Sequence, residues 1–72
     1  MAISYKKLWK LLIDKGMKKG DLILAAGVSS NIIAKLGRNE YVSMESLEKI
    51  CISLNCDIGD IVSVNIEVNK SE

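Results

Sequence analysis

Histidine is absent from this 72-residue sequence, and its two cysteines, Cys51 and Cys56, are not spaced as a CxxC pair. Neither a zinc site nor a dithiol redox motif can therefore be assembled from these residues. Both cysteines stand among apolar neighbours, which favours buried free thiols. The sequence also lacks a phosphate-binding glycine loop and a nucleophile–base pair, so we expect no enzyme, no catalytic residue, no cofactor and no metal.

Long apolar runs are also missing. No stretch approaches the roughly 18 consecutive apolar residues that a membrane-spanning helix needs, and the N-terminus lacks the apolar segment of a secretory signal. We therefore expect a cytoplasmic protein with no membrane partner, and no small-molecule substrate is evident. The composition, 49% hydrophobic and 26% charged, is typical of a globular chain, and 72 residues make one small domain.

Basic and acidic residues are unevenly distributed along the chain. The formal net charge is only +1. Residues 1–20 nevertheless hold six lysines against Asp14 alone, whereas residues 41–72 hold six acidic residues against Lys49 and Lys70. A molecule polarised in this way can bind phosphate with its basic side although its net charge is near zero.

The stretch over residues 19–38 reads KGDLILAAGVSSNIIAKLGR. Apolar residues recur at helical spacing on both sides of Gly27, which predicts a helix over 18–26, a break, and a second helix over 30–36. Gly27 suits the left-handed residue that ends a helix, and either Ser29 or Ser30 can cap the next one. Such a short connection makes the helices cross steeply and leaves a polar face of the second helix free, as in a helix-turn-helix that enters the major groove of DNA.

Further helices flank this pair. Ser4 is the expected N-cap of a helix that runs to about residue 15, and Ser43 caps a helix that runs to Leu54, with Met44 opening its apolar stripe. Asp57 opens a short fifth helix. The prediction is an all-α fold of five helices, with the helix-turn-helix in the second and third, over a domain of residues 1–62.

The spacing of the apolar residues changes from helical to alternating near the C-terminus. Val62, Val64, Ile66 and Val68 alternate with polar residues, which predicts a half-buried β-strand. A single strand needs a partner, either the N-terminal residues of the same chain or the same strand of a second subunit. No other convincing strand is found, which favours the second subunit, so residues 63–72 are expected to form a C-terminal strand or tail and a candidate dimerisation element.

With this organisation, the chain resembles the lambda-repressor-like DNA-binding domains of the Cro/C1 or XRE type, and most of all their small, single-domain bacterial branch. Two stretches carry the resemblance beside the helix-turn-helix, namely Ser4–Lys19 (SYKKLWKLLIDKGMKK) and Leu54–Val62 (LNCDIGDIV). The resemblance covers about residues 4–62. It implies a five-helix lambda-repressor-like bundle whose third helix reads double-stranded DNA.

The resemblance also assigns roles to particular residues. Positions that face the bases fall on Ser30, Asn31 and Lys35, with Ala34 and Ile32 near the groove. Positions that face phosphates fall on Lys19, Ser29 and Arg38. Lys18, at the start of the second helix, is expected to join them through its charge.

Two residues depart from the family pattern. Ile23 stands where many members have alanine, at a point where helices 2 and 3 approach closely, so the larger side chain must separate the helices or find a pocket. Ala34 cannot form a hydrogen bond with a base and can at most touch a thymine methyl group.

Two functions are compatible with these features. The first is a transcriptional regulator, a repressor, that binds DNA as a homodimer because three base-reading side chains are few for one domain. The second is a helix-turn-helix scaffold used as a protein-interaction module, such as an antitoxin-like partner. In that case Leu24, Ile32 and the acidic C-terminal half would form the contact.

Overall fold

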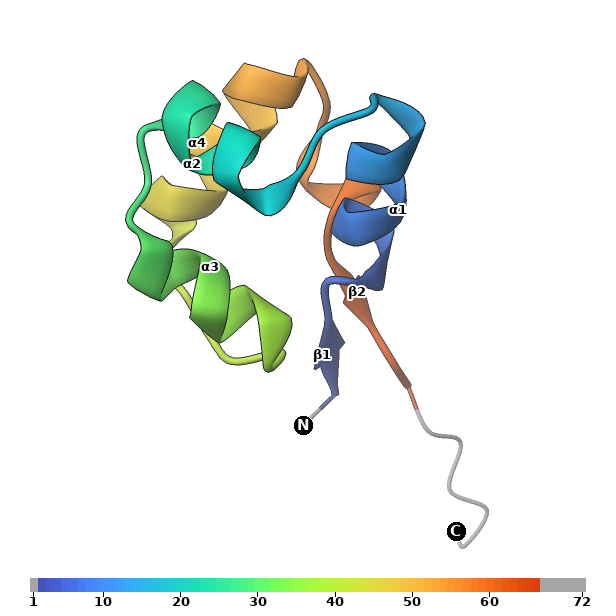
Figure 1. The fold of residues 1–72 in the computed structure, drawn as a ribbon. Coiled ribbons are helices and arrows are strands. Elements are labelled where there is room, and N and C mark those ends of the chain that lie inside the picture. The colour runs from blue at the N-terminus through green and yellow to red at the C-terminus, as the bar shows by residue number, and fades with distance from the viewer. Residues whose placement is uncertain (1, 67–72) are drawn as a thin grey trace, which may run out of the picture.

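Four α-helices and two short strands form the described part of the chain. The computed structural model describes residues 2–66, and Figure 1 shows its elements. In chain order they are β1 (Ile3–Ser4), α1 (Lys6–Asp14), α2 (Lys19–Ala26), α3 (Ser30–Gly37), α4 (Met44–Leu54), a 3-10 turn η1 (Ile58–Asp60) and β2 (Ser63–Val64). The mostly helical fold confirms the expected class.

The expected fifth helix is wrong, because η1 is a single 3-10 turn. The Asp57 carboxylate accepts a hydrogen bond of 2.9 Å from the backbone N–H of Ile58, and the Asp60 carboxylate accepts one of 2.9 Å from the N–H of Asp57. These short-range bonds close the turn on itself, and by Ser63 the chain has entered the extended strand β2. Asp57 therefore caps the element as expected, but the element has only three residues.

The strand near the C-terminus pairs within its own chain. β2 lies antiparallel to β1, with Ile3 opposite Val64 and Ser4 opposite Ser63. The N–H of Asn65 extends the contact by donating to the carbonyl of Ala2 at 2.7 Å. Of the two partners considered for Ser63–Val64, the structure thus shows the N-terminal one and not the second subunit that the sequence favoured. The part of the predicted strand beyond residue 66 lies outside the described residues.

The caps of the two flanking helices differ in how well they were predicted. Ser43 caps α4, and its hydroxyl accepts a hydrogen bond of 3.1 Å from the N–H of Ser46. The N-cap of α1 is Tyr5 and not Ser4, although the Ser4 hydroxyl still accepts from the N–H of Lys6 at 3.2 Å. Met44, expected on the buried stripe of α4, is 66% exposed because it stands at the first turn of the helix, where the core no longer reaches it.

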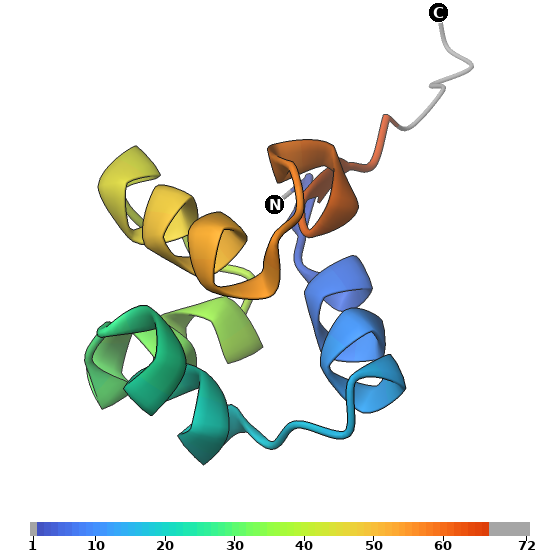
Figure 2. The ribbon, with the colours of Figure 1, turned by 90° about the horizontal axis from the view of Figure 1, so that it is seen from above.

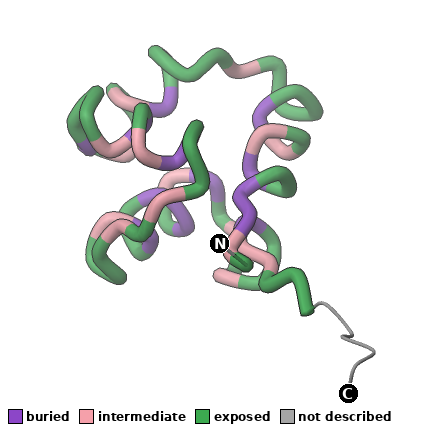
Figure 3. Tube along the Cα trace, turned by 90° about the horizontal axis from the view of Figure 1, so that it is seen from below, coloured by how far each residue is buried: buried purple, intermediate pink, exposed green. Residues whose placement is uncertain are grey.

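One hydrophobic core joins all the helices. In Figure 2, α1 and η1 lie on one side and α2, α3 and α4 on the other, and Figure 3 shows buried stretches along each helix. The buried hydrophobic residues are Tyr5, Leu8, Leu12, Leu22, Val28, Ile33, Leu36, Leu47, Ile50, Cys51, Leu54 and Ile61. Cys51 is a buried free thiol and Cys56 a half-buried one. Within residues 2–66, none of the helices combines the length and the apolar character that crossing a membrane requires.

Candidate nucleic-acid interface

The connection between α2 and α3 has the geometry that the sequence predicts. Gly27 ends α2 in the left-handed conformation, at φ 69°, and its N–H donates to the carbonyl of Ile23 at 3.0 Å. Val28 then enters the core. Ser29 is the N-cap of α3, and its hydroxyl accepts a hydrogen bond of 3.2 Å from the N–H of Ile32. A glycine stop and a serine start thus confine the break to three residues between the two helices.

Helix α3 has one buried face and one free face. Ile33 and Leu36 are buried in the core. Ser30, Asn31 and Ala34 are exposed. Asn31 and Ala34 lie on the side of the helix away from Ile33 and Leu36, and Ser30, three residues before Ile33, lies at the edge of that face in the exposed first turn. The free face therefore offers a hydroxyl, an amide and a methyl group to a partner.

Ile32 lies at the margin of that free face, and Lys35 lies on it near the end of the helix. Both side chains are half-buried. Lys35 belongs to the last turn of α3, where a cation is favoured by the helix dipole. Of the four residues expected to face bases, Lys35 is thus the one with the least exposed side chain.

The start of α2 presents two lysines. Lys18 is the N-cap of this helix and Lys19 its first residue, and both are exposed. The backbone N–H of Lys18 donates to the Asp21 carboxylate at 2.9 Å, which ties the first turn together. This leaves the side chain of Lys18 extending from the exposed start of the helix-turn-helix.

Lys19 connects α2 with two other helices. Its Nζ lies 4.5 Å from the centroid of the Trp9 ring on α1, a cation–π contact. If Gly37, the last residue of α3, carried a methyl group, the same Nζ would lie 3.8 Å from it. The ammonium group is therefore held close to the C-terminal end of α3.

Arg38 is paired with a carboxylate that the sequence analysis did not single out. Its Nε donates to Glu40 at 2.7 Å, and a second guanidinium nitrogen donates to the other carboxylate oxygen at 3.4 Å. These hydrogen bonds are the main cause that lowers the pKa of Glu40, and the positive charge of Lys35 acts in the same direction. Glu40 thus stands beside two of the cations expected to contact DNA.

A second contact holds the loop after α3 against the start of α1. The Tyr5 hydroxyl donates to the backbone carbonyl of Glu40 at 2.8 Å, and the Tyr5 N–H donates to the Asn39 side-chain oxygen at 3.1 Å. Asn39 adopts the left-handed conformation, at φ 56°, which asparagine tolerates better than most residues. Burial raises the pKa of Tyr5, so the phenol keeps its proton and remains a donor. The C-terminal end of α3 is therefore anchored to a separate helix.

Ile23, the first departure from the family pattern, has found space at the edge of the core. Its side chain is half-buried and packs against the core cluster. Helices α2 and α3 still form a closely connected pair whose axes cross (Figure 1).

The expected phosphate-facing residues lie at the ends of α2 and α3. Lys18 and Lys19 lie at the start of α2, Ser29 at the start of α3 and Arg38 at its end, and the Nζ of Lys19 also reaches toward that end. What the sequence analysis missed are the neighbours of these residues, Trp9 and Glu40. The opposite charges of Arg38 and Glu40, two residues apart in a loop, were the available signal for the second.

Comparison with known proteins finds one matching family and a similar solved structure. The family model of the Cro/C1-type HTH DNA-binding domain matches residues 7–67. The chain is also similar to the crystal structure of the transcriptional regulator VanUg, with 57% sequence identity and a TM-score of 0.85 over 92% of this chain and 88% of that chain. No curated protein matches.

Proposed function

Because the chain belongs to the Cro/C1-type helix-turn-helix DNA-binding family, we propose that it regulates transcription by reading the major groove of double-stranded DNA with α3. The observation that carries the proposal is the free face of α3. Asn31 and Ala34 are exposed there, with Ser30 at its edge, while Ile33 and Leu36 fix the opposite face in the core. The similar structure of a transcriptional regulator supports the same assignment.

The free face of α3 has the chemistry that base recognition needs. Asn31 can form a bidentate pair with adenine, Lys35 can donate to guanine O6 or N7, and Ser30 can donate or accept. Ala34 can contact a thymine methyl group. Each good bidentate contact discriminates against a wrong base by about 1–3 kcal/mol.

Phosphate contacts are proposed for the residues at the ends of the two helices. Lys18 and Lys19 supply charge at the start of α2, Ser29 supplies a hydroxyl at the start of α3, and Arg38 follows its last residue. These residues flank the reading face, so phosphates on either side of the groove would meet a donor. Such contacts position α3 and provide affinity without sequence preference.

We further propose a homodimer that acts as a repressor. One domain with three hydrogen-bonding readers covers few base pairs, and two copies related by a two-fold axis would read two half-sites about one helical turn, or roughly 34 Å, apart. A protein of this kind can repress a gene by occupying its control site, without contacting any other protein.

Selection from a random pool of DNA duplexes tests the proposed function. The expected result is enrichment of one sequence with two-fold symmetry, and binding that weakens steeply as salt rises. The variant Ser30→Ala/Asn31→Ala/Lys35→Ala should enrich nothing, whereas Lys49→Ala, which removes an exposed lysine on α4, should select the same site as the wild type. Failure of the wild-type protein to enrich any duplex would contradict the proposal.

A further inference from the structure

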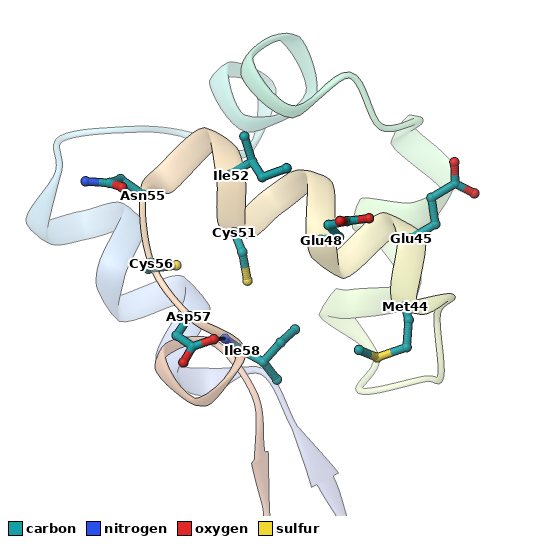
Figure 4. Close-up of a pocket in the computed structure, with 9 residues that line it drawn as sticks. All are labelled: Met44, Glu45, Glu48, Cys51, Ile52, Asn55, Cys56, Asp57 and Ile58. Atoms are coloured by element: carbon teal, nitrogen blue, oxygen red, sulfur yellow. Dashed lines mark hydrogen bonds between the residues drawn. The ribbon is translucent and has the colours of Figure 1, made fainter.

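The surface between α4 and η1 carries an acidic groove of about 680 Å³. Figure 4 shows the side chains that line it. Its acidic and apolar residues are Glu45, Glu48, Asp57, Met44, Ile52 and Ile58. Two of the apolar side chains are largely open to solvent, Met44 at 66% and Ile52 at 73%. The groove thus combines apolar surface with acidic residues along its rim.

A second groove, of about 510 Å³, lies beside the first, between α1 and the segment that follows α4. It is lined by Lys7, Lys10 and Lys15 of α1 and its C-cap, with Asp14 and Asp60 as the acidic members. The Nζ of Lys7 donates to the carbonyl of Gly59 at 3.0 Å, which joins α1 to η1. Lys10 and Lys15 remain exposed on its surface.

The two grooves meet along one boundary. Asn55 and Cys56 line both of them, and in Figure 4 these residues stand between the ribbon of α1 and the rest of the acidic groove. The acidic groove therefore lies on one side of Asn55 and Cys56, and the lysine-lined groove lies on the other.

A surface divided in this way is complementary to itself. A two-fold rotation about an axis near Asn55 and Cys56 places the acidic groove of one copy over the lysine-lined groove of its partner, and the reverse at the same time. An interface between identical subunits with two-fold symmetry requires this kind of self-complementarity. We propose that this surface is where two copies of the chain associate, an inference that rests on the homodimer in the proposed function.

Two features of the surface fit such an association. Pairing would bury the exposed side chains of Met44 and Ile52 and bring carboxylates next to lysines. The residues of both grooves come from α1, α4 and the segment over residues 55–60. Helix α3 lies outside both grooves, so its reading face would stay free for DNA in each copy.

Charge reversal tests the inference without needing to know which residues pair. One variant, Glu45→Lys/Glu48→Lys, makes both grooves basic, and the other, Lys10→Glu/Lys15→Glu, makes both acidic. In sedimentation equilibrium without DNA, each variant alone should dissociate, with the dimer dissociation constant raised about ten- to a hundredfold by like charges in contact. Mixed in equal amounts, the two variants should again form a dimer, because each now complements the other.

Two controls accompany this experiment. Lys6→Glu/Lys49→Glu makes the same change in net charge as the second variant at exposed positions outside both grooves, and it should dimerise as the wild type does. Circular dichroism of each variant should match the wild type. If a double variant fails to fold, the single substitutions Glu48→Lys and Lys10→Glu replace it in the same mixing scheme.

Several results would overturn the inference. These are a monomeric wild-type protein, a dimer that neither variant weakens, a mixture that does not reassociate, or a mass that grows beyond the dimer as concentration rises, which would indicate a head-to-tail contact. A monomer that still selects one half-site from the random pool would overturn this inference and leave DNA reading intact. A charge-dependent dimer that selects no DNA would support this inference and contradict DNA reading.

Discussion

The Tyr5 hydroxyl donates a hydrogen bond of 2.8 Å to the backbone carbonyl of Glu40, across 35 positions of the sequence. This bond joins the start of α1 to the loop that leaves α3. Tyr5 is 2% exposed and Glu40 is half-buried, so removal of the hydroxyl leaves a partly buried carbonyl without that donor. The bond is thus one of the contacts that hold the loop after α3 in place.

Substitution of Tyr5 by phenylalanine tests the strength of this contact. We expect Tyr5→Phe to lower the free energy of unfolding by about 1 kcal/mol, because one partly buried hydrogen bond is lost while the ring remains. Urea denaturation measures the change. Tyr41→Phe is the matched control, since the side chain of Tyr41 is 70% exposed and its hydroxyl should contribute almost nothing. Equal effects of the two substitutions would contradict the assigned role.

Glu40 should weaken DNA binding in the wild-type protein. Its carboxylate pairs with Arg38 and lies near Lys35, so it offsets positive charge that would otherwise meet phosphate. We expect Glu40→Gln to strengthen binding to any duplex by roughly two- to fivefold at low salt, and the gain should shrink as salt rises. The same substitution made in an Arg38→Ala background should give a smaller gain. An unchanged or weakened affinity for Glu40→Gln in the wild-type background would contradict this role.

Replacement by alanine should have opposite effects at Gly20, in α2, and at Gly27, the C-cap of that helix. A methyl group at Gly20 or Gly27 meets no atom within 4 Å beyond the chain neighbours and the backbone of its own helix, but Gly27 has φ 69°. We expect Gly27→Ala to destabilise the fold by about 1 kcal/mol or more, because the left-handed conformation is strained for alanine. Gly20→Ala, in the first turn of α2, should stabilise the fold by up to about 1 kcal/mol. Thermal denaturation of both variants measures the difference, and a gain in stability for Gly27→Ala would be the contrary result.

Alkaline pH should remove the stabilising contribution of the Cys51 thiol. Burial, with a further effect from Cys56, raises the pKa of Cys51 from 9.0 to about 11. As pH rises from 9 to 11, the thiol ionises in the unfolded chain while the folded chain keeps its proton, so the free energy of unfolding falls. Denaturation with a non-thiol reductant measures the free energy of unfolding of the wild type and of Cys51→Ala at pH 8 and pH 11. The difference between the two proteins should be smaller at pH 11 than at pH 8. The same difference at both pH values would contradict this expectation.

The helix-turn-helix and α4 were predictable because local residues determine them. Gly27, Ser29 and Ser43 act within one turn of their own positions, through a left-handed stop and two hydroxyl caps. Their effect can be read from the sequence without knowing what else lies nearby. The boundaries of α3 and α4 follow from these signals and from the spacing of the apolar residues between them.

The remaining features depend on residues that are distant in sequence. The Trp9 ring meets Lys19, and Tyr5 meets Asn39, only after α1 has packed against the other helices. β1 has two residues, too few to show an alternating pattern, so the strand partner within the chain could not be recognised. Asp57 signalled the start of η1, but nothing in the sequence indicated that the turn would stop after three residues.

Asn31→Ala tests most directly the proposal that α3 reads bases. The measurement is the sequence selected from a random duplex pool by this variant, compared with the wild type and with Lys18→Ala. We expect Asn31→Ala to lose its preference at one base pair of each half-site, a change of about 1–3 kcal/mol in discrimination, and Lys18→Ala to weaken all duplexes alike. A selected sequence that is unchanged by Asn31→Ala at every position would contradict the proposal.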